Sequence, residues 1–251
     1  GHVKAIVGGR GAKTTSLSLN RATASPKQPG SCFKVLSTYA PGLNECGMTL
    51  ATKTKDEPYR YASGQPVNNW DNKYIGSARV RYAIEHSMNV CAVRTLTETV
   101  GLEKGYKYLE NFGFTTLVNN DPNYPGMSDI AQATALGGIT RGVYNIEMTA
   151  AYAAIANSGI YTEPLLYTEI LDHDGNVLID NSKPITRRVL KESTAFLLTS
   201  AMQDVINRGT GTPARLNNMP AAGKTGTTEN STDLWLSAYT PYYTCSVWTG
   251  Y

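Results

Sequence analysis

The pattern of hydrophobic and polar positions runs from strand-like to helical and back again. Residues 2–7 alternate and lead into Gly8-Gly9, which predicts a strand and a turn. Apolar residues at helical spacing then predict helices over 31–40, within 77–113, over 145–157 and over 190–207. Residues 165–179 predict a hairpin that turns at Asp174-Gly175. Further strands are predicted over 221–228, 234–240 and 242–251.

Strands therefore open and close the chain, and helices fill its middle. This order predicts an α/β or α+β body with an inserted helical lobe, roughly residues 44–160. Residues 44–75 are polar and show no clear periodicity, so no element is predicted there.

Composition is ordinary for a globular chain of 251 residues, with 41% apolar and 17% charged positions. The net charge of +3 is small and Lys and Arg do not cluster, which argues against nucleic acid as a partner. No apolar run approaches the ~20 residues of a membrane span.

The four cysteines, Cys32, Cys46, Cys91 and Cys245, show no C-x-x-C spacing. Only three histidines accompany them, and none has ligand spacing with a cysteine, so we expect no metal site and no cofactor. Buried free thiols are expected, with disulfides as the alternative.

The stretch QPGSCFK at 28–34 offers the first candidate chemistry. Pro29-Gly30 breaks the preceding chain, and Ser31 and Lys34 stand one helical turn apart on the same face. This S-x-x-K spacing is typical of a serine nucleophile with a lysine as its proton acceptor. A plain helix start explains the same residues, so the rest of the chain has to decide.

Other candidate sites are weaker. Residues 7–14 look like a phosphate loop, but Ala12 stands where a Walker A loop has the glycine before its lysine. No G-x-S-x-G occurs, and His86 and His173 lack the pattern of a serine-histidine-acid triad. Cys32 is a conceivable nucleophile without a recognisable histidine partner.

Two further motifs form an ordered set with the first. Ser87-Met88-Asn89 lies between a predicted helix that ends near His86 and another that starts near Val90. Lys224-Thr225-Gly226-Thr227 lies on a predicted strand. S-x-x-K, S-x-N and K-T-G in this order are typical of penicilloyl serine transferases. A second S-x-N at 18–20 precedes the S-x-x-K and therefore has the wrong order.

With these motifs in place, the chain resembles the transpeptidase domain of class A penicillin-binding proteins. The resemblance runs nearly end to end, through VKAIVGG, LNRATASPKQPGSCFK, IGSARVRYAIEHSMNVCAVRTLTETVG, ALGGITRGVYNIEMTAAYAAIANSGIYTEP, INRGTGTPARL, AAGKTGTT, DLWLSAYTP and VWTGY. It implies a serine β-lactamase/transpeptidase-like fold: an antiparallel β-sheet flanked by helices, with an inserted all-helical lobe. It also implies one transpeptidase domain over residues 1–251.

Family members carry a strand before VKAIVGG and a final strand and helix after VWTGY. We therefore expect this chain to be a fragment of a larger protein, whose remaining part is a further expected partner. The resemblance places the domain on the extracytoplasmic face of the bacterial cell membrane, with membrane contact only through segments outside this chain.

The resemblance also implies a reaction. Ser31 attacks the carbonyl between the two terminal D-alanines of a peptidoglycan stem peptide, and the acyl group passes from Ser31 to an acceptor amine. β-Lactams mimic the D-Ala-D-Ala end and stall the cycle at the ester. Lys34 is the implied base, Ser87 relays the proton to the leaving amine, and Lys224 adds positive charge.

Substrate contacts follow from the same resemblance. Asn89 holds the substrate amide, and the hydroxyls of Thr225 and Thr227 bind the substrate carboxylate. Gly226 leaves room for the ligand backbone. The backbone N–H groups of Ser31 and Thr227 form the implied oxyanion hole.

Two lysines in one site have a physical reason. Lys34 accepts a proton only when neutral, and lowering the pKa of a lysine by ~3 units from its usual 10.4 costs about 4 kcal/mol. Burial and a second cation such as Lys224 both act in that direction.

Departures and rival functions remain. Cys32 stands where the family usually has a small hydroxyl residue, which predicts sensitivity to oxidation, and Val35 replaces a common proline. A class A β-lactamase would carry S-D-N and an E-x-x-L-N string, and neither occurs here. A D,D-carboxypeptidase and a non-catalytic β-lactam sensor or scaffold keep the same motifs, so both stay open.

Overall fold

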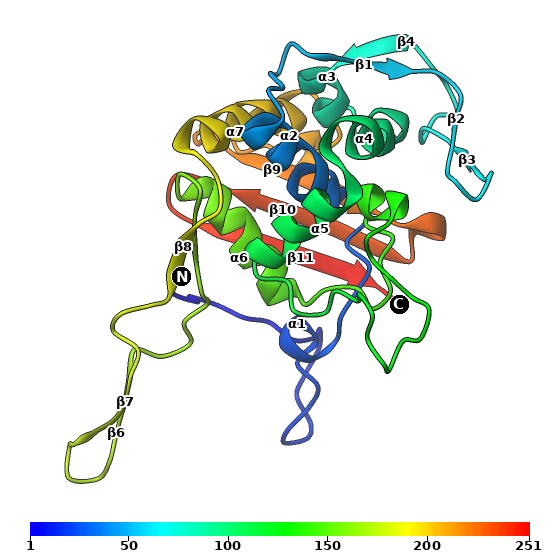
Figure 1. Cartoon of the computed structure of the whole chain (residues 1–251). Coiled ribbons are helices and arrows are strands. Elements are labelled where there is room, and N and C mark those ends of the chain that lie inside the picture. The colour runs from blue at the N-terminus through cyan, green and yellow to red at the C-terminus, as the bar shows by residue number, and fades with distance from the viewer.

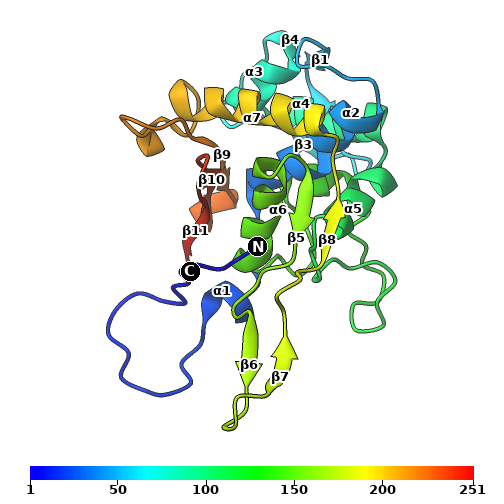
Figure 2. The same ribbon diagram turned by 90° about the vertical axis from the view of Figure 1, so that its left-hand side faces the viewer.

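A three-stranded antiparallel sheet forms one side of the molecule (Figures 1 and 2). In the computed structural model, which describes residues 1–251, the sheet has the order β11-β10-β9. Its strands are β9 (Ala222–Thr227), β10 (Asp233–Tyr239) and β11 (Thr244–Gly250). Burial alternates along β10, where Trp235 and Tyr239 face the interior and Leu234 faces outward. These three strands confirm the sequence prediction.

Two long helices cover the inner side of this sheet. Helix α6 (Asn145–Ala156) packs on β10 and β11, and α7 (Glu192–Asn207) lies against β9. Helix α7 buries a stripe at helical spacing, formed by Ala195, Leu198, Met202, Val205 and Ile206. Both helices were predicted from that spacing and are confirmed.

The segment that carries Ser31 runs through the centre of the molecule. It consists of the 3₁₀-helix η1 (Gly30–Cys32), the π-helical η2 (Lys34–Tyr39) and α2 (Ala40–Glu45). Residues 32–42 are all buried, and they include the polar Lys34, Ser37 and Thr38. The predicted end at Pro41-Gly42 is wrong, because Pro41 sits in the first turn of α2, where a proline needs no hydrogen-bond partner.

The resemblance implied an all-helical inserted lobe; the lobe carries helices but is not all-helical, and α6, which lies within the expected bounds 44–160, packs on the sheet. The lobe contains α3 (Val80–Glu85), α4 (Asn89–Thr95), η3 (Leu96–Val100), α5 (Leu102–Asn111) and η4 (Gln132–Leu136). It also has two short ladders that the sequence did not predict: β1 (Lys53–Asp56) with β4 (Gly76–Arg79), and β2 (Tyr59–Arg60) with β3 (Pro66–Val67). Such short, polar strands show no alternation in the sequence.

The predicted strand at 2–7 is wrong. Only an isolated bridge joins His2 to Leu165, and residues 4–7 are exposed with no partner strand. The predicted hairpin is confirmed as β6 (Glu169–Leu171) and β7 (Val177–Asp180), which project away from the body (Figures 1 and 2). The remaining elements are α1 (Arg21–Ala24), β5 (Ile160–Thr162), β8 (Thr186–Arg188), η5 (Thr212–Ala214) and η6 (Glu229–Ser231).

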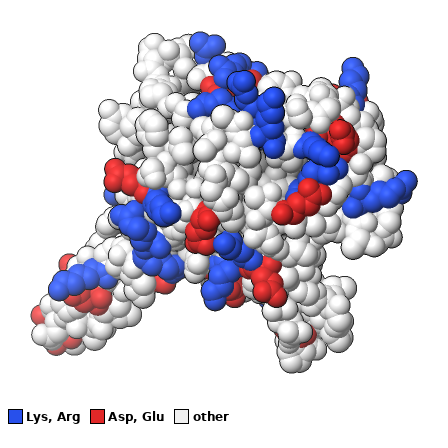
Figure 3. Space-filling view, turned by 45° about the horizontal axis from the view of Figure 1, so that its top comes forward, with Lys and Arg blue, Asp and Glu red and all other residues white.

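Charged side chains of both signs are interspersed with uncharged surface on the face shown in Figure 3. None of the helices combines the length and apolar character that a bilayer crossing requires.

Candidate active site

The three motifs meet where the sheet, the central helix and the inserted lobe come together. Ser87 Oγ is the meeting point: it lies 3.1 Å from Lys34 Nζ and 2.8 Å from Lys224 Nζ. Lys34 comes from η2, Ser87 from the turn between α3 and α4, and Lys224 from β9. The structure thus brings together two amines and a hydroxyl that are up to 190 positions apart in the sequence.

Close backbone packing brings the turn that leads into Ser31 against the edge strand β9. Gly30 has φ +53°, and a Cβ atom there would lie 3.1 Å from the backbone nitrogen of Thr227. On the other side, a Cβ atom on Gly137 would overlap the backbone of Gly30. Glycine at both positions therefore lets the start of η1 lie between β9 and the ALGG segment.

Two backbone N–H groups are open at this junction. The N–H of Ser31 donates to no acceptor in the chain. Thr228 N donates to Asp233 O, so by ladder alternation the N–H of Thr227 points away from β10, towards the free edge beside Gly30. Ser31 itself is half-buried, and its hydroxyl has no hydrogen-bond partner. This geometry is the one expected of an oxyanion hole next to a serine.

Lys34 lies on the central helix and is completely buried in the protein. Its Nζ lies 2.5 Å from Ser87 O and 2.5 Å from Asn89 Oδ1, in addition to the contact with Ser87 Oγ. Burial, reinforced by the charge of Lys224, holds the pKa of Lys34 well below its usual range.

Lys224 is also completely buried, and it donates to Ser87 Oγ and to Thr225 O at 3.1 Å. Burial lowers the pKa of Lys224 to about 8. Thr225 and Thr227 alternate onto the opposite face of β9, and Thr227 is exposed. The hydroxyl of Thr225 lies 2.7 Å from that of Thr210.

Ser87 has a left-handed backbone conformation with φ +55°, which is unusual for a residue other than glycine. Ser87 N donates to Ile84 O and Met88 N donates to Ala83 O. This is a Schellman motif that ends α3, with serine in the position where glycine is preferred. The conformation aims the hydroxyl of Ser87 at the two lysines.

The side chain of Asn89 is partly occupied within the chain. Its Nδ2 donates to Asn68 O at 2.8 Å, and its Oδ1 accepts from Lys34. One N–H of Nδ2 and the second lone pair of Oδ1 remain for a substrate amide.

A Cβ atom on Gly226 would lie 2.6 Å from Pro29 O and 3.0 Å from Cys32 Sγ, so this glycine makes room for η1. The expectations for Cys32 need correction. The thiol of Cys32 is fully buried, donates to Lys224 O at 3.4 Å, and has its pKa raised to about 11 by burial. Cys32 is therefore neither the nucleophile nor an oxidation-sensitive group.

All four cysteines are free; Cys32 and Cys91 are buried as expected, Cys46 is half-buried and Cys245 is exposed. Nowhere do three His, Cys, Asp or Glu side chains gather as metal ligands would. Thr210 is a site residue that the three motifs did not identify; its only signal was its place in INRGTGTPARL.

Comparison with known proteins agrees with this geometry. The family model described as the penicillin binding protein transpeptidase domain matches residues 1–251. Penicillin-binding protein 1A of Clostridium acetobutylicum is 39% identical over 262 residues, covering 100% of this chain and 31% of that protein. The chain thus spans about a third of the length of this relative.

Solved structures show the same fold. Penicillin-binding protein 1A from Haemophilus influenzae superimposes with a TM-score of 0.78 and 26% identity, over 94% of this chain and 39% of that one. The PonA1 protein of Mycobacterium tuberculosis, solved in complex with penicillin V, has a TM-score of 0.78 and 24% identity, over 94% of this chain and 63% of that one. With a family model that matches its whole length, the chain belongs to the transpeptidase domain family of penicillin-binding proteins, among the class A members.

Proposed function

We propose that this domain is a serine-type D,D-transpeptidase that crosslinks peptidoglycan stem peptides through an acyl-enzyme on Ser31. The observation that carries the proposal is the buried bridge from Lys34 through Ser87 to Lys224. A hydroxyl between two amines of lowered pKa provides a route for a proton, which acyl transfer needs twice in each cycle.

In the first half-reaction, Ser31 Oγ attacks the carbonyl carbon of the penultimate D-alanine, and its proton passes to the neutral amine of Lys34. The open N–H groups of Ser31 and Thr227 stabilise the oxyanion; each such donor is typically worth ~3–4 kcal/mol in the barrier. The C–N bond then breaks, and the terminal D-alanine leaves as an amine. Ser87 gives that nitrogen a proton and regains one from the ammonium of Lys34.

In the second half-reaction, an acceptor amine attacks the ester carbonyl. Its proton returns through Ser87 to Lys34, and the Ser31–acyl bond breaks as Ser31 Oγ is reprotonated. Donor and acceptor peptides are then joined by a new amide bond, and the enzyme is restored.

The contacts of Lys34 suit the role of base. A neutral amine has two N–H bonds and one lone pair, and two of the three contacts, Ser87 O and Asn89 Oδ1, can only accept. The lone pair is therefore left for a hydroxyl: in this structure the hydroxyl next to it is that of Ser87, and Ser31 Oγ makes no hydrogen bond to Lys34. Lys224, with its pKa at about 8, remains mostly charged at pH 7 and supports the neutral state of Lys34.

Substrate and inhibitor contacts extend the proposal. Thr225 and Thr227 would bind the terminal carboxylate of the substrate, and Asn89 would accept one of its amide N–H groups. β-Lactams would acylate Ser31 in the same way, as the penicillin V complex of the similar PonA1 protein supports. We also propose that the domain works on the extracytoplasmic face of the cell membrane, where its substrate is found.

Labelling with a fluorescent penicillin tests Ser31 as the nucleophile. The wild type should carry a stable label on a denaturing gel, Ser31→Ala should carry none, and Ser18→Ala should be labelled like the wild type, because Ser18 lies in an exposed loop. Label on Ser31→Ala would reject the assignment, and rapid loss of label from the wild type would indicate a hydrolase.

Product analysis separates transfer from hydrolysis. A stem pentapeptide incubated with a D-amino acid acceptor should yield the exchanged peptide by mass spectrometry. Release of D-alanine without exchange would contradict the transpeptidase and favour a carboxypeptidase.

A further inference from the structure

The turn that carries Ser87 cannot secure the start of the next helix by itself. Met88 occupies the N-cap position of α4 and makes no side-chain cap hydrogen bond. The first N–H groups of any helix lack partners within that helix, so they need acceptors from elsewhere. Asn89, which contacts Lys34, is the first residue of α4 and shares this need.

Asn69 supplies the missing acceptor from another part of the chain. Its Oδ1 lies 2.9 Å from Asn89 N and 3.2 Å from Val90 N. The neighbouring carbonyl of Asn68 accepts from the side chain of Asn89. Two adjacent residues therefore hold both the backbone and the side chain of Asn89.

Asn69 is itself held from behind by a buried carboxylate. Its Nδ2 donates to Asp56 Oδ1 at 2.8 Å and to Lys73 O at 2.9 Å, and the second carboxylate oxygen of Asp56 accepts from Ile75 N at 2.8 Å. Asp56 is fully buried and forms no ion pair. Because each amide atom of Asn69 has a partner, its orientation is fixed: oxygen towards α4, nitrogen towards the carboxylate.

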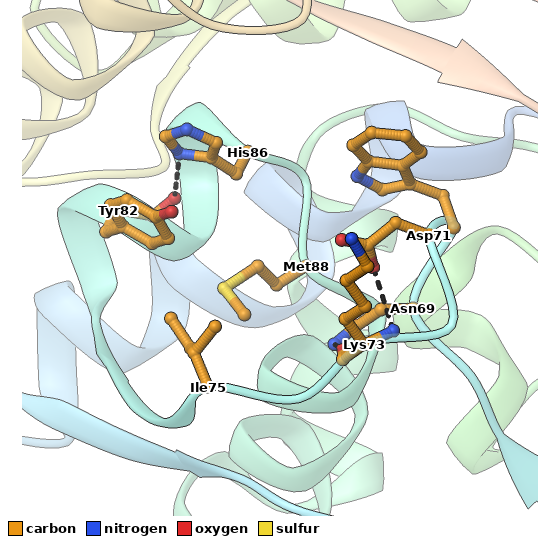
Figure 4. A pocket seen from close by; sticks show the side chains of 8 residues that line it. Asn69, Asp71, Lys73, Ile75, Tyr82, His86 and Met88 are labelled. Atoms are coloured by element: carbon orange, nitrogen blue, oxygen red, sulfur yellow. Dashed lines mark hydrogen bonds between the residues drawn. The ribbon is translucent and has the colours of Figure 1, made fainter.

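Figure 4 shows Asn69 among the residues that line a small pocket. Asn69 and Lys73 lie on one side of the pocket, Ile75 and Tyr82 on the other, and the side chain of Met88 points between them. The 69–75 segment and Met88 of the Ser87–Asn89 turn therefore line the same pocket.

We infer that Asn69, oriented by Asp56, is a positioning residue that holds the Ser87–Asn89 turn against Lys34. The inference rests on the proposed function, because it assigns these two residues an effect on acyl transfer. Neither residue contacts Lys34, Ser31 or Lys224. Their effect passes through the start of α4, where the main chain of Asn89 is anchored.

The exchange of the two side-chain types gives a sharp test. Asn69→Asp places two carboxylates face to face, and Asp56→Asn leaves either Ile75 N or the amide of Asn69 without an acceptor. In the double variant Asp56→Asn/Asn69→Asp, the new carboxylate at 69 accepts from α4 and from the new amide at 56, whose oxygen accepts from Ile75 N. Only Lys73 O, which accepts from Asn69 Nδ2 in the wild type, is left without this donor. We expect acylation of Ser31 by a fluorescent penicillin to slow about 10–100-fold in Asn69→Asp, the size of effect found when a residue that orients a metal ligand is replaced, and to recover part of that loss in the double variant.

Asn44 provides the matched control for a merely structural effect. Like Asn69 it is buried and uses both ends of its amide, donating to Tyr108 OH at 2.7 Å and accepting from Lys191 N at 2.9 Å. Asn69→Ala and Asn44→Ala should lower the melting temperature by similar amounts. Only Asn69→Ala should slow acylation.

Hydrogen exchange of the amides of Asn89 and Val90 gives a readout that is independent of activity. Both amides should lose protection in Asn69→Ala and keep it in Asn44→Ala. Wild-type acylation in Asn69→Ala, or a double variant no faster than Asn69→Asp while folded, would overturn the inference. An unlabelled wild type would instead contradict the proposed function, and the exchange result would still decide whether Asn69 holds the turn.

Discussion

The left-handed conformation of Ser87 allows its backbone and its hydroxyl to be tested separately. Ser87 is 8% exposed and has φ +55°. Ser87→Ala and Ser87→Gly both remove the contacts of Oγ with Lys34 Nζ at 3.1 Å and Lys224 Nζ at 2.8 Å. Only the glycine variant also relieves the backbone.

The difference between the two variants can be given a size. A left-handed conformation costs about 1–2 kcal/mol for a residue with a Cβ atom. Glycine avoids that cost but loses about 0.5–1 kcal/mol through its greater freedom in the unfolded chain. Ser87→Gly should therefore be more stable than Ser87→Ala by about 1 kcal/mol, although it has the smaller side chain.

Urea unfolding and penicillin acylation, measured on the same samples, check both parts. Ser87→Gly should have the higher midpoint at an unchanged slope, and both variants should acylate about 10²–10⁴-fold more slowly than the wild type if Ser87 carries the proton. Equal midpoints would refute the backbone argument. Wild-type acylation in the glycine variant would remove the hydroxyl from the proton route.

Three further predictions concern Lys224, Gly226 and Lys34. Burial lowers the pKa of Lys224 from 10.5 to about 8, so the unfolded chain binds this proton more tightly and stability rises with pH between those values. In chemical denaturation, the free energy of unfolding of the wild type should rise relative to that of Lys224→Met by about 2 kcal/mol between pH 7 and 9.5. Parallel curves of unfolding free energy against pH for the two proteins would contradict this. Gly226→Ala brings a Cβ atom to 2.6 Å from Pro29 O, so we expect the free energy of unfolding to fall by about 1–3 kcal/mol and acylation by penicillin to slow. A melting temperature equal to that of the wild type would contradict the close packing. Lys34→Arg should acylate about 10²–10⁴-fold more slowly, since a guanidinium stays charged and cannot accept the proton, and a near-wild-type rate would exclude Lys34 as the base.

Residues with a local, periodic signal could be predicted from the sequence. The helix over 190–207 and the strands over 221–251 follow from spacing and turn residues, and the three motifs follow from their order. Their order does not show that Lys34 and Lys224 meet at Ser87 Oγ, which is a long-range contact of the folded chain.

What the sequence could not show depends on tertiary contacts. The 2–7 segment alternates like a strand, but nothing in the pattern says whether a partner strand lies beside it. Gly226 marks a close approach, and the pattern does not reveal that the approaching group is Pro29. Asn69 stands in a polar segment without periodicity, and its role is visible only once α4 lies against it.

The proposed chemistry depends on one property, the neutral state of the Lys34 amine at pH 7. Lysine labelled with ¹³C at Cε reports protonation through its chemical shift, and Lys34→Gln identifies the resonance by its absence. We predict that the Lys34 resonance lies at the neutral-amine position at pH 7 and titrates closer to the ordinary range in Lys224→Met, because the second cation is gone. A Lys34 resonance that stays at the ammonium position until pH 10 would contradict the proposed role of Lys34 as base.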